Sequence, residues 1–210
     1  MKSAFAKAMQ HLPLVAILRG IQADEVEPIG EVLVASGFRL IEVPLTYPDA
    51  FESIARLVRL LPHDVIVGAG TVRRREQLDR LVDAGGRLMV TPHADPALIE
   101  APVAAGLATL PGVATPSEAV CALDAGADGL KLFPSSSIPP ATVAAFRTVV
   151  GKDVDLCPAG GVEPEDFAGY VKAGASGFGL GGGLYRPGHG PAEVAARARA
   201  YVDSWRARHA

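Results

Sequence analysis

The chain has 210 residues, of which 49% are hydrophobic and 20% are charged, so it can bury a substantial core and shows no sign of disorder. Lys and Arg total 20 against 23 acidic residues, a balance that gives no general attraction for nucleic acid or for an anionic membrane surface. The two cysteines, Cys121 and Cys157, lack the spacing of a disulfide framework or a zinc site, and a reducing cytoplasmic location fits them best.

Residues 1–10 are expected to form a short amphipathic helix, since they lack the long apolar stretch and the cleavage site of a signal peptide. From there, short apolar runs alternate with stretches of helical spacing, which predicts strand-helix units. The helix that begins near Thr115 carries a capping-box pattern, with Pro116 in its first position and Glu118 three residues after the cap. Strands are predicted at residues 14–18, 40–45, 64–70, 88–92, 107–111, 129–133, 155–159 and 177–181, and helices at 23–36, 49–61, 74–84, 95–105, 115–125, 140–150, 164–173 and 191–206.

Eight such units of roughly 25 residues predict a single domain, residues 1–210, folded as a (β/α)8 TIM barrel with a short N-terminal helix. A doubly wound open sheet also accommodates alternating units, but the chain has no Gly-x-Gly-x-x-Gly motif after its first strand. No apolar run approaches the ~20 residues that span a bilayer, and no linker-like segment divides the chain. In a barrel the active site lies at the C-terminal ends of the strands, so polar residues there are the functional candidates.

Lys131 and Glu42 interrupt predicted apolar strands, although a buried parallel strand seldom contains a charge. Burial disfavours the protonated form of a lysine, and the free amine can attack a keto group to form a Schiff base. A carboxylate within reach can move the protons that this reaction requires. The alternatives are a buried ion pair without a catalytic role, or a lysine whose end reaches water. Together the two residues suit amine chemistry, with Lys131 as the covalent centre.

Glycine pairs follow the seventh and eighth predicted strands, where barrels often bind phosphate through backbone N–H groups. Ser135, after the sixth strand, can add a hydroxyl donor. Arg19 and Thr71, after the first and third strands, are candidates for a substrate carboxylate. His93 has no partner at ligand spacing, so no metal site is predicted. The phosphate-side glycines are Gly160, Gly161, Gly181 and Gly182.

Six segments carry a resemblance that extends over about residues 12–201, in order and with matching spacing. They are Ala-Ile-Leu-Arg-Gly-Ile at 16–21, Ile-Glu-Val-Pro-Leu at 41–45, Val-Gly-Ala-Gly-Thr-Val at 67–72, Leu-Lys-Leu-Phe-Pro-Ser at 130–135, Gly-Gly-Val at 160–162 and Leu-Tyr-Arg at 184–186. The set resembles the 2-keto-3-deoxy-6-phosphogluconate / 6-phosphogalactonate aldolase family.

The resemblance implies a class I aldolase that uses neither a metal nor a cofactor and cleaves a phosphorylated 2-keto-3-deoxy sugar acid to pyruvate and glyceraldehyde 3-phosphate. Lys131 matches the family's Schiff-base lysine and Glu42 its general acid-base. Arg19, Thr71 and Pro92 match residues on the carboxylate side of the substrate, while Ser135 and the four glycines named above match the phosphate side. Members of the family form homotrimers, so a homotrimer is expected here.

The segments are closer to the phosphogalactonate branch, in which the loop after the second strand lacks an arginine; Thr46 stands in that neighbourhood here. Pro158 follows the phosphogluconate pattern, and Ala159 matches neither branch, since the phosphogluconate enzymes usually have Thr there and the phosphogalactonate enzymes Val. The expected substrate is 2-dehydro-3-deoxy-6-phosphogalactonate. The alternatives are the epimeric 6-phosphogluconate compound, a metal-dependent aldolase on a similar barrel, and a non-catalytic barrel that binds a phosphate or a sugar acid.

Overall fold

The structure, a computed structural model, describes residues 3–208 and consists of parallel strands that alternate with helices. Six strands form one parallel sheet in the order β5-β4-β3-β2-β1-β9, and three form a second in the order β6-β7-β8. The strands are β1 (Leu14–Ile17), β2 (Leu40–Pro44), β3 (Ile66–Gly70), β4 (Leu88–Val90), β5 (Ala108–Leu110), β6 (Gly112–Val113), β7 (Gly129–Leu132), β8 (Asp155–Pro158) and β9 (Phe178–Leu180).

The helices follow the predicted spans closely. Those at 140–150 and 191–206 have the predicted bounds, and the Thr115–Glu118 capping box forms at the start of its helix. The expected N-terminal helix spans 4–11, and residues 1 and 2 of that prediction lie outside the described residues. The helices are α1 (Ala4–His11), α2 (Val26–Ala35), α3 (Ala50–Leu60), α4 (Glu76–Asp83), α5 (Pro96–Ala104), α6 (Pro116–Asp124), α7 (Pro140–Val150), α8 (Phe167–Lys172) and α9 (Pro191–Arg206), with short 3-10 turns η1 (Ser135–Ser137) and η2 (Pro164–Asp166).

Two predicted elements differ in the structure. The fifth predicted strand, 107–111, is observed as β5 (Ala108–Leu110), and a short strand that was not predicted, β6 (Gly112–Val113), follows Pro111. Pro111 separates the two because proline has no N–H to give to a sheet ladder, although the Pro111 carbonyl oxygen accepts a hydrogen bond from the Lys131 N–H at 2.9 Å. The seventh predicted helix, 164–173, begins as the 3-10 turn η2 and becomes α-helical only at Phe167.

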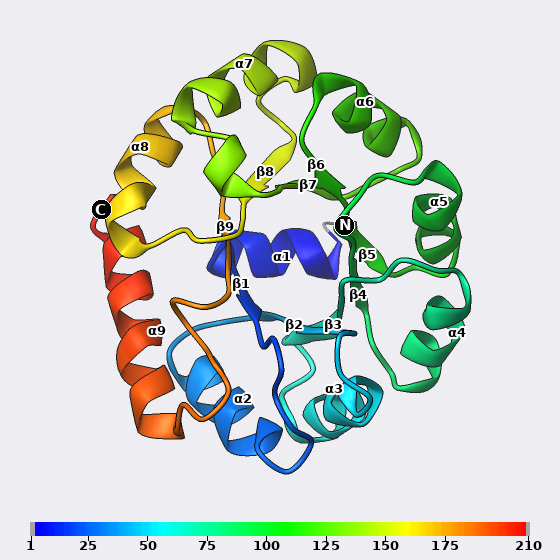
Figure 1. Cartoon of the computed structure of the whole chain (residues 1–210), viewed down its shortest axis with the longest axis vertical. Helices are drawn as coiled ribbons and strands as arrows, with labels where there is room; N and C mark the ends of the chain where they lie inside the picture. The colour runs from blue at the N-terminus through cyan, green and yellow to red at the C-terminus, as the bar shows by residue number, and fades with distance from the viewer. Residues whose placement is uncertain (1–2, 209–210) are drawn as a thin grey trace.

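The two sheets adjoin on both sides. The N–H of Asp128, just before β7, donates to the carbonyl of Thr109 in β5 at 3.2 Å, and a parallel bridge joins Ala159 to Gly179 of β9. Figure 1 shows the strands around the middle of the molecule, with α2 to α9 outside them and α1 crossing the centre. The chain therefore has an α/β fold of parallel, curved sheets surrounded by helices.

The apolar core has two parts. A small cluster on the inner face of the sheets contains Phe5, Ala8 and Met9 of α1, packed with strand residues that include Leu40 and Cys157. A larger cluster lies between the outer face of the strands and the surrounding helices. Helix α1 thus covers the inner face at the end where the strands begin, while the opposite end carries the loops that bear the predicted site residues.

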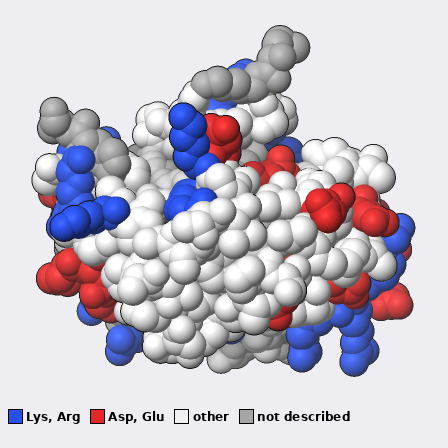
Figure 2. Space-filling view, turned by 90° about the horizontal axis from the view of Figure 1, so that it is seen from above, with Lys and Arg blue, Asp and Glu red and all other residues white. Residues whose placement is uncertain are grey.

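Charged side chains of both signs are spread over the surface. Figure 2, which looks onto the α7 side, shows them gathered toward the edges of that face around an uncharged central area. Within residues 3–208, no helix is long and apolar enough to cross a membrane.

Candidate active site

Lys131 of β7 and Glu42 of β2 meet on the inner face of the sheets, although 89 residues separate them in the sequence. The Lys131 ammonium nitrogen Nζ lies 3.2 Å from Glu42 Oε1, and the side chains are only 9% and 1% exposed. The predicted contact between the two charges is confirmed. Desolvation makes such a pair a weak source of net stability, so its presence inside two otherwise apolar strands favours a chemical role.

Strand register explains how the carboxylate reaches this position. Glu42 is paired with Gly68 on β3, and the β3 strand ends two residues later at Gly70. A Cβ atom added to Gly70 would lie 1.3 Å from Glu42 Oε2, so the carboxylate occupies the space that any side chain at position 70 would fill. The glycine is therefore a requirement of the site as well as of the strand.

The second carboxylate oxygen, Glu42 Oε2, is buried and has no hydrogen-bond partner among the described residues. A buried carboxylate oxygen without a donor is costly unless a ligand or a proton completes it. Lys131 Nζ also lies 5.5 Å from the centre of the Phe133 ring, so one side of the amine is apolar. The arrangement presents an amine and an incompletely bonded carboxylate together, as imine chemistry on a carbonyl substrate requires.

The three residues predicted on the carboxylate side follow β1, β3 and β4, which all belong to the six-stranded sheet. Arg19 is exposed in the turn after β1, and Pro92 is half-buried after β4. Thr71, directly after β3, has φ 56°, a left-handed conformation that is strained for a β-branched residue and is found most often at functional sites. The structure thus places Thr71 next to the glycine that accommodates the Glu42 carboxylate.

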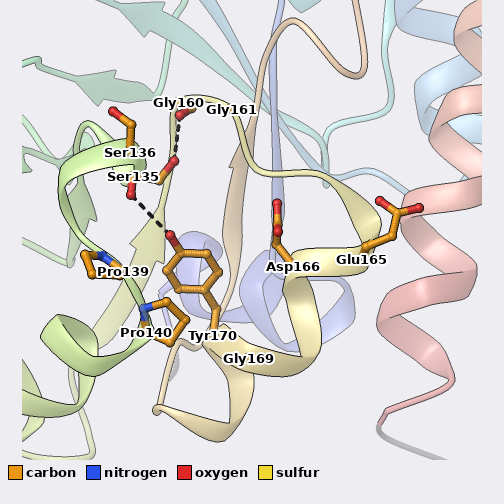
Figure 3. A pocket seen from close by; sticks show the side chains of 10 residues that line it. All are labelled: Ser135, Ser136, Pro139, Pro140, Gly160, Gly161, Glu165, Asp166, Gly169 and Tyr170. Carbon is orange, nitrogen blue, oxygen red and sulfur yellow. Dashed lines mark hydrogen bonds between the residues drawn. The ribbon is translucent and has the colours of Figure 1, made fainter.

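Three of the predicted phosphate-side residues lie together in a pocket of about 490 Å³ (Figure 3). Ser135 donates its hydroxyl hydrogen to the Gly160 carbonyl at 2.6 Å, and its backbone N–H donates to the Ala159 carbonyl at 2.9 Å. Gly160 and Gly161 both have positive φ, 100° and 95°, which orients the loop after β8. This pocket does not contain Lys131 or Glu42.

Two acidic residues line this pocket and make it less favourable for an anion. Glu165 and Asp166 lie on the turn beyond Gly161, and in Figure 3 the Glu165 carboxylate is directed away from the serines. The Asp166 carboxylate accepts the Glu163 N–H at 2.9 Å. Both charges oppose an anion in the part of the pocket that they line.

The other two predicted phosphate-side residues, Gly181 and Gly182, lie after β9 and outside this pocket. The Gly181 carbonyl accepts hydrogen bonds from the Leu184 and Tyr185 N–H groups, at 2.8 and 2.9 Å, and so forms a tight turn. The bridge between Ala159 and Gly179 brings this turn beside the loop after β8. The two glycine pairs are therefore neighbours, as expected for adjacent strands.

Sequence reasoning missed three contributors to the site. Gly70 and Gly112 occupy inner positions where a side chain would meet, respectively, the Glu42 carboxylate and the Pro92 backbone carbonyl carbon, the latter at 2.6 Å. For Gly70 the available signal was a glycine inside a predicted strand, whereas Gly112 lies just beyond the predicted strand 107–111. Tyr170 of α8 supports the serine loop by donating its hydroxyl to the carbonyls of Ser135 and Ile138, at 3.2 and 3.1 Å, and no sequence pattern marks it.

Cys157 lies on β8 directly beside Lys131 in the strand register and is fully buried. Burial raises the pKa of the Cys157 thiol, so the sulfur stays protonated and acts as a small packing group. Among residues 3–208, no group of three or more His, Cys, Asp or Glu side chains is arranged to hold a metal ion.

Comparison with known proteins gives consistent matches over most of the chain. The family model for KDPG and KHG aldolase matches residues 5–188. A relative from Rhizobium meliloti, named "Probable 2-dehydro-3-deoxy-6-phosphogalactonate aldolase", is 44% identical and covers 92% of this chain and 91% of its own. The Escherichia coli 2-dehydro-3-deoxy-6-phosphogalactonate aldolase is 40% identical over 93% of this chain and 95% of its own. A solved structure described as "Native KDPGal structure" superposes with a TM-score of 0.91, at 40% identity, over 93% of this chain and 95% of that one.

Proposed function

The chain belongs to the KDPG and KHG aldolase family and is a carbon-carbon lyase, and from this we propose that it cleaves 2-dehydro-3-deoxy-6-phosphogalactonate to pyruvate and D-glyceraldehyde 3-phosphate. The observation that carries the proposal within the molecule is the buried contact between Lys131 Nζ and Glu42 Oε1 at 3.2 Å. It supplies the amine and the proton carrier that a metal-free aldol cleavage needs.

In the proposed first stage, the neutral amine of Lys131 attacks the C2 keto carbon to form a carbinolamine. Loss of one water molecule then gives the protonated Schiff base, with Glu42 as the group that delivers and removes the protons. The free Oε2 atom of Glu42 supports this role, because it is buried and has no hydrogen-bond partner among residues 3–208.

In the second stage, Glu42 takes the proton from the C4 hydroxyl while the C3–C4 bond breaks. The bonding electrons pass into the iminium group as an enamine, and glyceraldehyde 3-phosphate leaves. Glu42 then returns the proton to C3, and one water molecule hydrolyses the resulting pyruvate imine to release pyruvate and free Lys131. The water lost in the first stage balances the water consumed here, so the net reaction is cleavage alone.

We assign the remaining residues to the two ends of the substrate. Arg19, Thr71 and Pro92 hold the carboxylate side, where a guanidinium fork and the strained turn at Thr71 (φ 56°) provide donors near the amine. Gly160, Gly161, Gly181 and Gly182 hold the phosphate side through backbone N–H groups of adjacent loops, and the Ser135 hydroxyl joins them by turning from the Gly160 carbonyl to the phosphate.

The choice of epimer rests on the two relatives at 44% and 40% identity, both named for the phosphogalactonate substrate. Ala159 is completely buried and offers no hydroxyl, so it cannot make the contact that a threonine would make there. The 6-phosphogluconate epimer remains the alternative substrate. A coupled assay of pyruvate release on the two epimers, side by side, tests both the reaction and the preference. Faster turnover of the phosphogluconate compound would reverse the assignment.

A barrel that binds a sugar acid without cleaving it is the second candidate, since a buried ion pair can exist without chemistry. Tight binding of the substrate by folded protein with no release of pyruvate would establish it. A metal-dependent aldolase is a third, and a loss of activity in a strong chelator would favour it over Lys131 chemistry.

Three structural expectations also belong to this proposal. We infer that the two adjoining sheets form one closed eight-stranded barrel in which β5 and β6 together make the fifth strand, supported by the hydrogen bonds across both junctions. We also propose a homotrimer. It is supported by apolar side chains that are exposed on α6 and α7, where Val120 is 42% exposed and Val149 is 49% exposed. Light scattering in solution tests the number of subunits. A cytoplasmic location remains a prediction from the cysteine content, which fractionation of cells tests.

A further inference from the structure

We propose that Arg73, Arg74 and Arg75, in the loop after β3, form a cationic rim that captures the anionic substrate at the mouth of the active site. The inference rests on the proposed function and extends it, because it assigns the β3–α4 loop a role in substrate capture. Together these three residues form the arginine rim.

The location of the arginine rim is fixed by the chain itself. Gly70 ends β3 against the Glu42 carboxylate, and Arg73 follows three residues later. Three residues of extended chain span at most about 11 Å, so Arg73 lies within about 11 Å of Gly70, the residue beside the Glu42 carboxylate. Strands β1, β2 and β3 are adjacent in the sheet, so the rim also lies on the same side of the mouth as Arg19 and Thr71.

The three guanidinium groups are available for a ligand. All three residues are exposed, and within residues 3–208 none of their side chains forms a hydrogen bond or an ion pair. By contrast, Arg39, Arg56 and Arg197 each pair with a carboxylate. Unpaired arginines in sequence repel one another and destabilise the loop slightly, which a bound anion would relieve.

The loop that carries the arginine rim is held in place by its backbone. The Gln77 side-chain oxygen accepts the N–H groups of Arg73 and Arg74, at 2.8 and 3.1 Å, so the side chains are not needed for the loop's shape. A hollow of about 470 Å³ lies here, lined by Arg73, Arg74, Glu76, Gln77 and Arg80. Arg80 is already engaged over the Phe51 ring at 4.1 Å, and Glu76 is the acid that opposes an anion at this place.

Charge is distributed unevenly around the mouth. The loop after β3 carries the arginine rim, whereas the loop and turn after β8 carry Glu163, Glu165 and Asp166. The chain as a whole has a formal charge of -3, which repels an anion at long range. The proposed substrate carries one carboxylate and a phosphate of about two negative charges, so it is drawn to the β3 side of the mouth before it reaches Lys131.

The test compares three triple variants under steady-state conditions. In the first, all three rim arginines are changed to Gln; in the second, all three are changed to Lys, which keeps the charge. The third, a control, changes Lys152, Lys172 and Arg199 to Gln, which removes the same charge from exposed positions outside the β3–α4 loop. Each is assayed for cleavage of the phosphorylated substrate from low to high salt, after folding has been checked by circular dichroism.

At low salt, kcat/KM of the Gln triple is expected to fall about three- to tenfold through KM, with kcat unchanged, and to approach the wild-type value in high salt. The Lys triple and the control are expected to stay within twofold of wild type. Equal kcat/KM and equal salt dependence for the Gln triple and the wild type would overturn the proposal, as would an equal loss in the control. A loss that Lys does not restore would also overturn it, because it would point to packing and not to charge.

Failure of the proposed function gives a different result, since the wild type itself would then release no pyruvate.

A readout independent of turnover is titration with inorganic phosphate, followed through the NMR signals of the arginine side-chain N–H groups. Saturable shifts for the rim in the wild type, and their loss in the Gln triple, support the anion site. Unchanged signals at all phosphate concentrations would refute it.

Discussion

The contact between Gly70 and the Glu42 carboxylate makes the site sensitive to a single methyl group. In a Gly70→Ala variant the new Cβ would lie 1.3 Å from Glu42 Oε2, whereas ordinary contact begins near 3.4 Å, so the carboxylate must retreat by about 2 Å. That movement breaks its 3.2 Å contact with Lys131 Nζ. A misplacement of ~1 Å in a catalytic group can cost ~100-fold in rate, so kcat should fall by at least about 100-fold, or ~2.7 kcal/mol.

The assay for this variant is steady-state pyruvate release, with the melting temperature as a check on folding. Gly190→Ala is the matched control, because a Cβ there meets nothing within 4 Å, and it should keep wild-type kcat. Adding Glu42→Asp to Gly70→Ala shortens the acid by one methylene and should recover part of the loss. A Gly70→Ala enzyme with kcat within twofold of wild type would refute the reasoning that this glycine holds the carboxylate in position.

Two further predictions concern stability. The Arg147 guanidinium donates four hydrogen bonds of 2.6 to 2.8 Å, to the carbonyls of Gly174, Gly151 and Val154 and to Ser176 Oγ. Because Arg147→Met removes all four, it should lower the free energy of unfolding, measured by urea titration, by about 3 kcal/mol. A decrease of less than about 1 kcal/mol would contradict this. The Ala114 N–H, with further donors at Thr115, holds the pKa of the Glu118 carboxyl below its usual 4.5. The capping box therefore stabilises the fold above about pH 4.5, and this contribution is lost as the pH falls through the lowered pKa of Glu118. Glu118→Gln should therefore cost about 1 kcal/mol at pH 7 and less at pH 3, and a cost that grows on acidification would contradict the assignment.

Much of the architecture could be predicted because it depends on local signals. The apolar runs and their helical neighbours located the strands, and the Thr115 to Glu118 pattern located a helix start to the residue. The short strand β6 beyond Pro111 was not predicted, although proline, which cannot donate to a ladder, is a signal for a break at that position. The Pro111 carbonyl accepts the Lys131 N–H of β7. The observed start of a helix differs from the predicted one where the first turn is a 3-10 turn, as at η2.

The site was predictable to the extent that burial makes a charge conspicuous. Lys131 and Glu42 could be paired because each interrupts an apolar strand, and they do meet. The role of Gly70 could not be predicted, because it follows from the length of the Glu42 side chain and from the register of β2 with β3. Likewise, the acids Glu165 and Asp166 beside the Ser135 pocket depend on where the turn after β8 folds back.

Cleavage by the proposed route requires Lys131 to form a covalent imine with the keto acid. The most direct measurement is to reduce the protein with borohydride in the presence of pyruvate and to locate the adduct by mass spectrometry of its peptides. The expected result is one reduced pyruvate imine on Lys131 and none after Lys131→Ala. An adduct on another lysine, or no adduct in an enzyme that still cleaves the substrate, would contradict it.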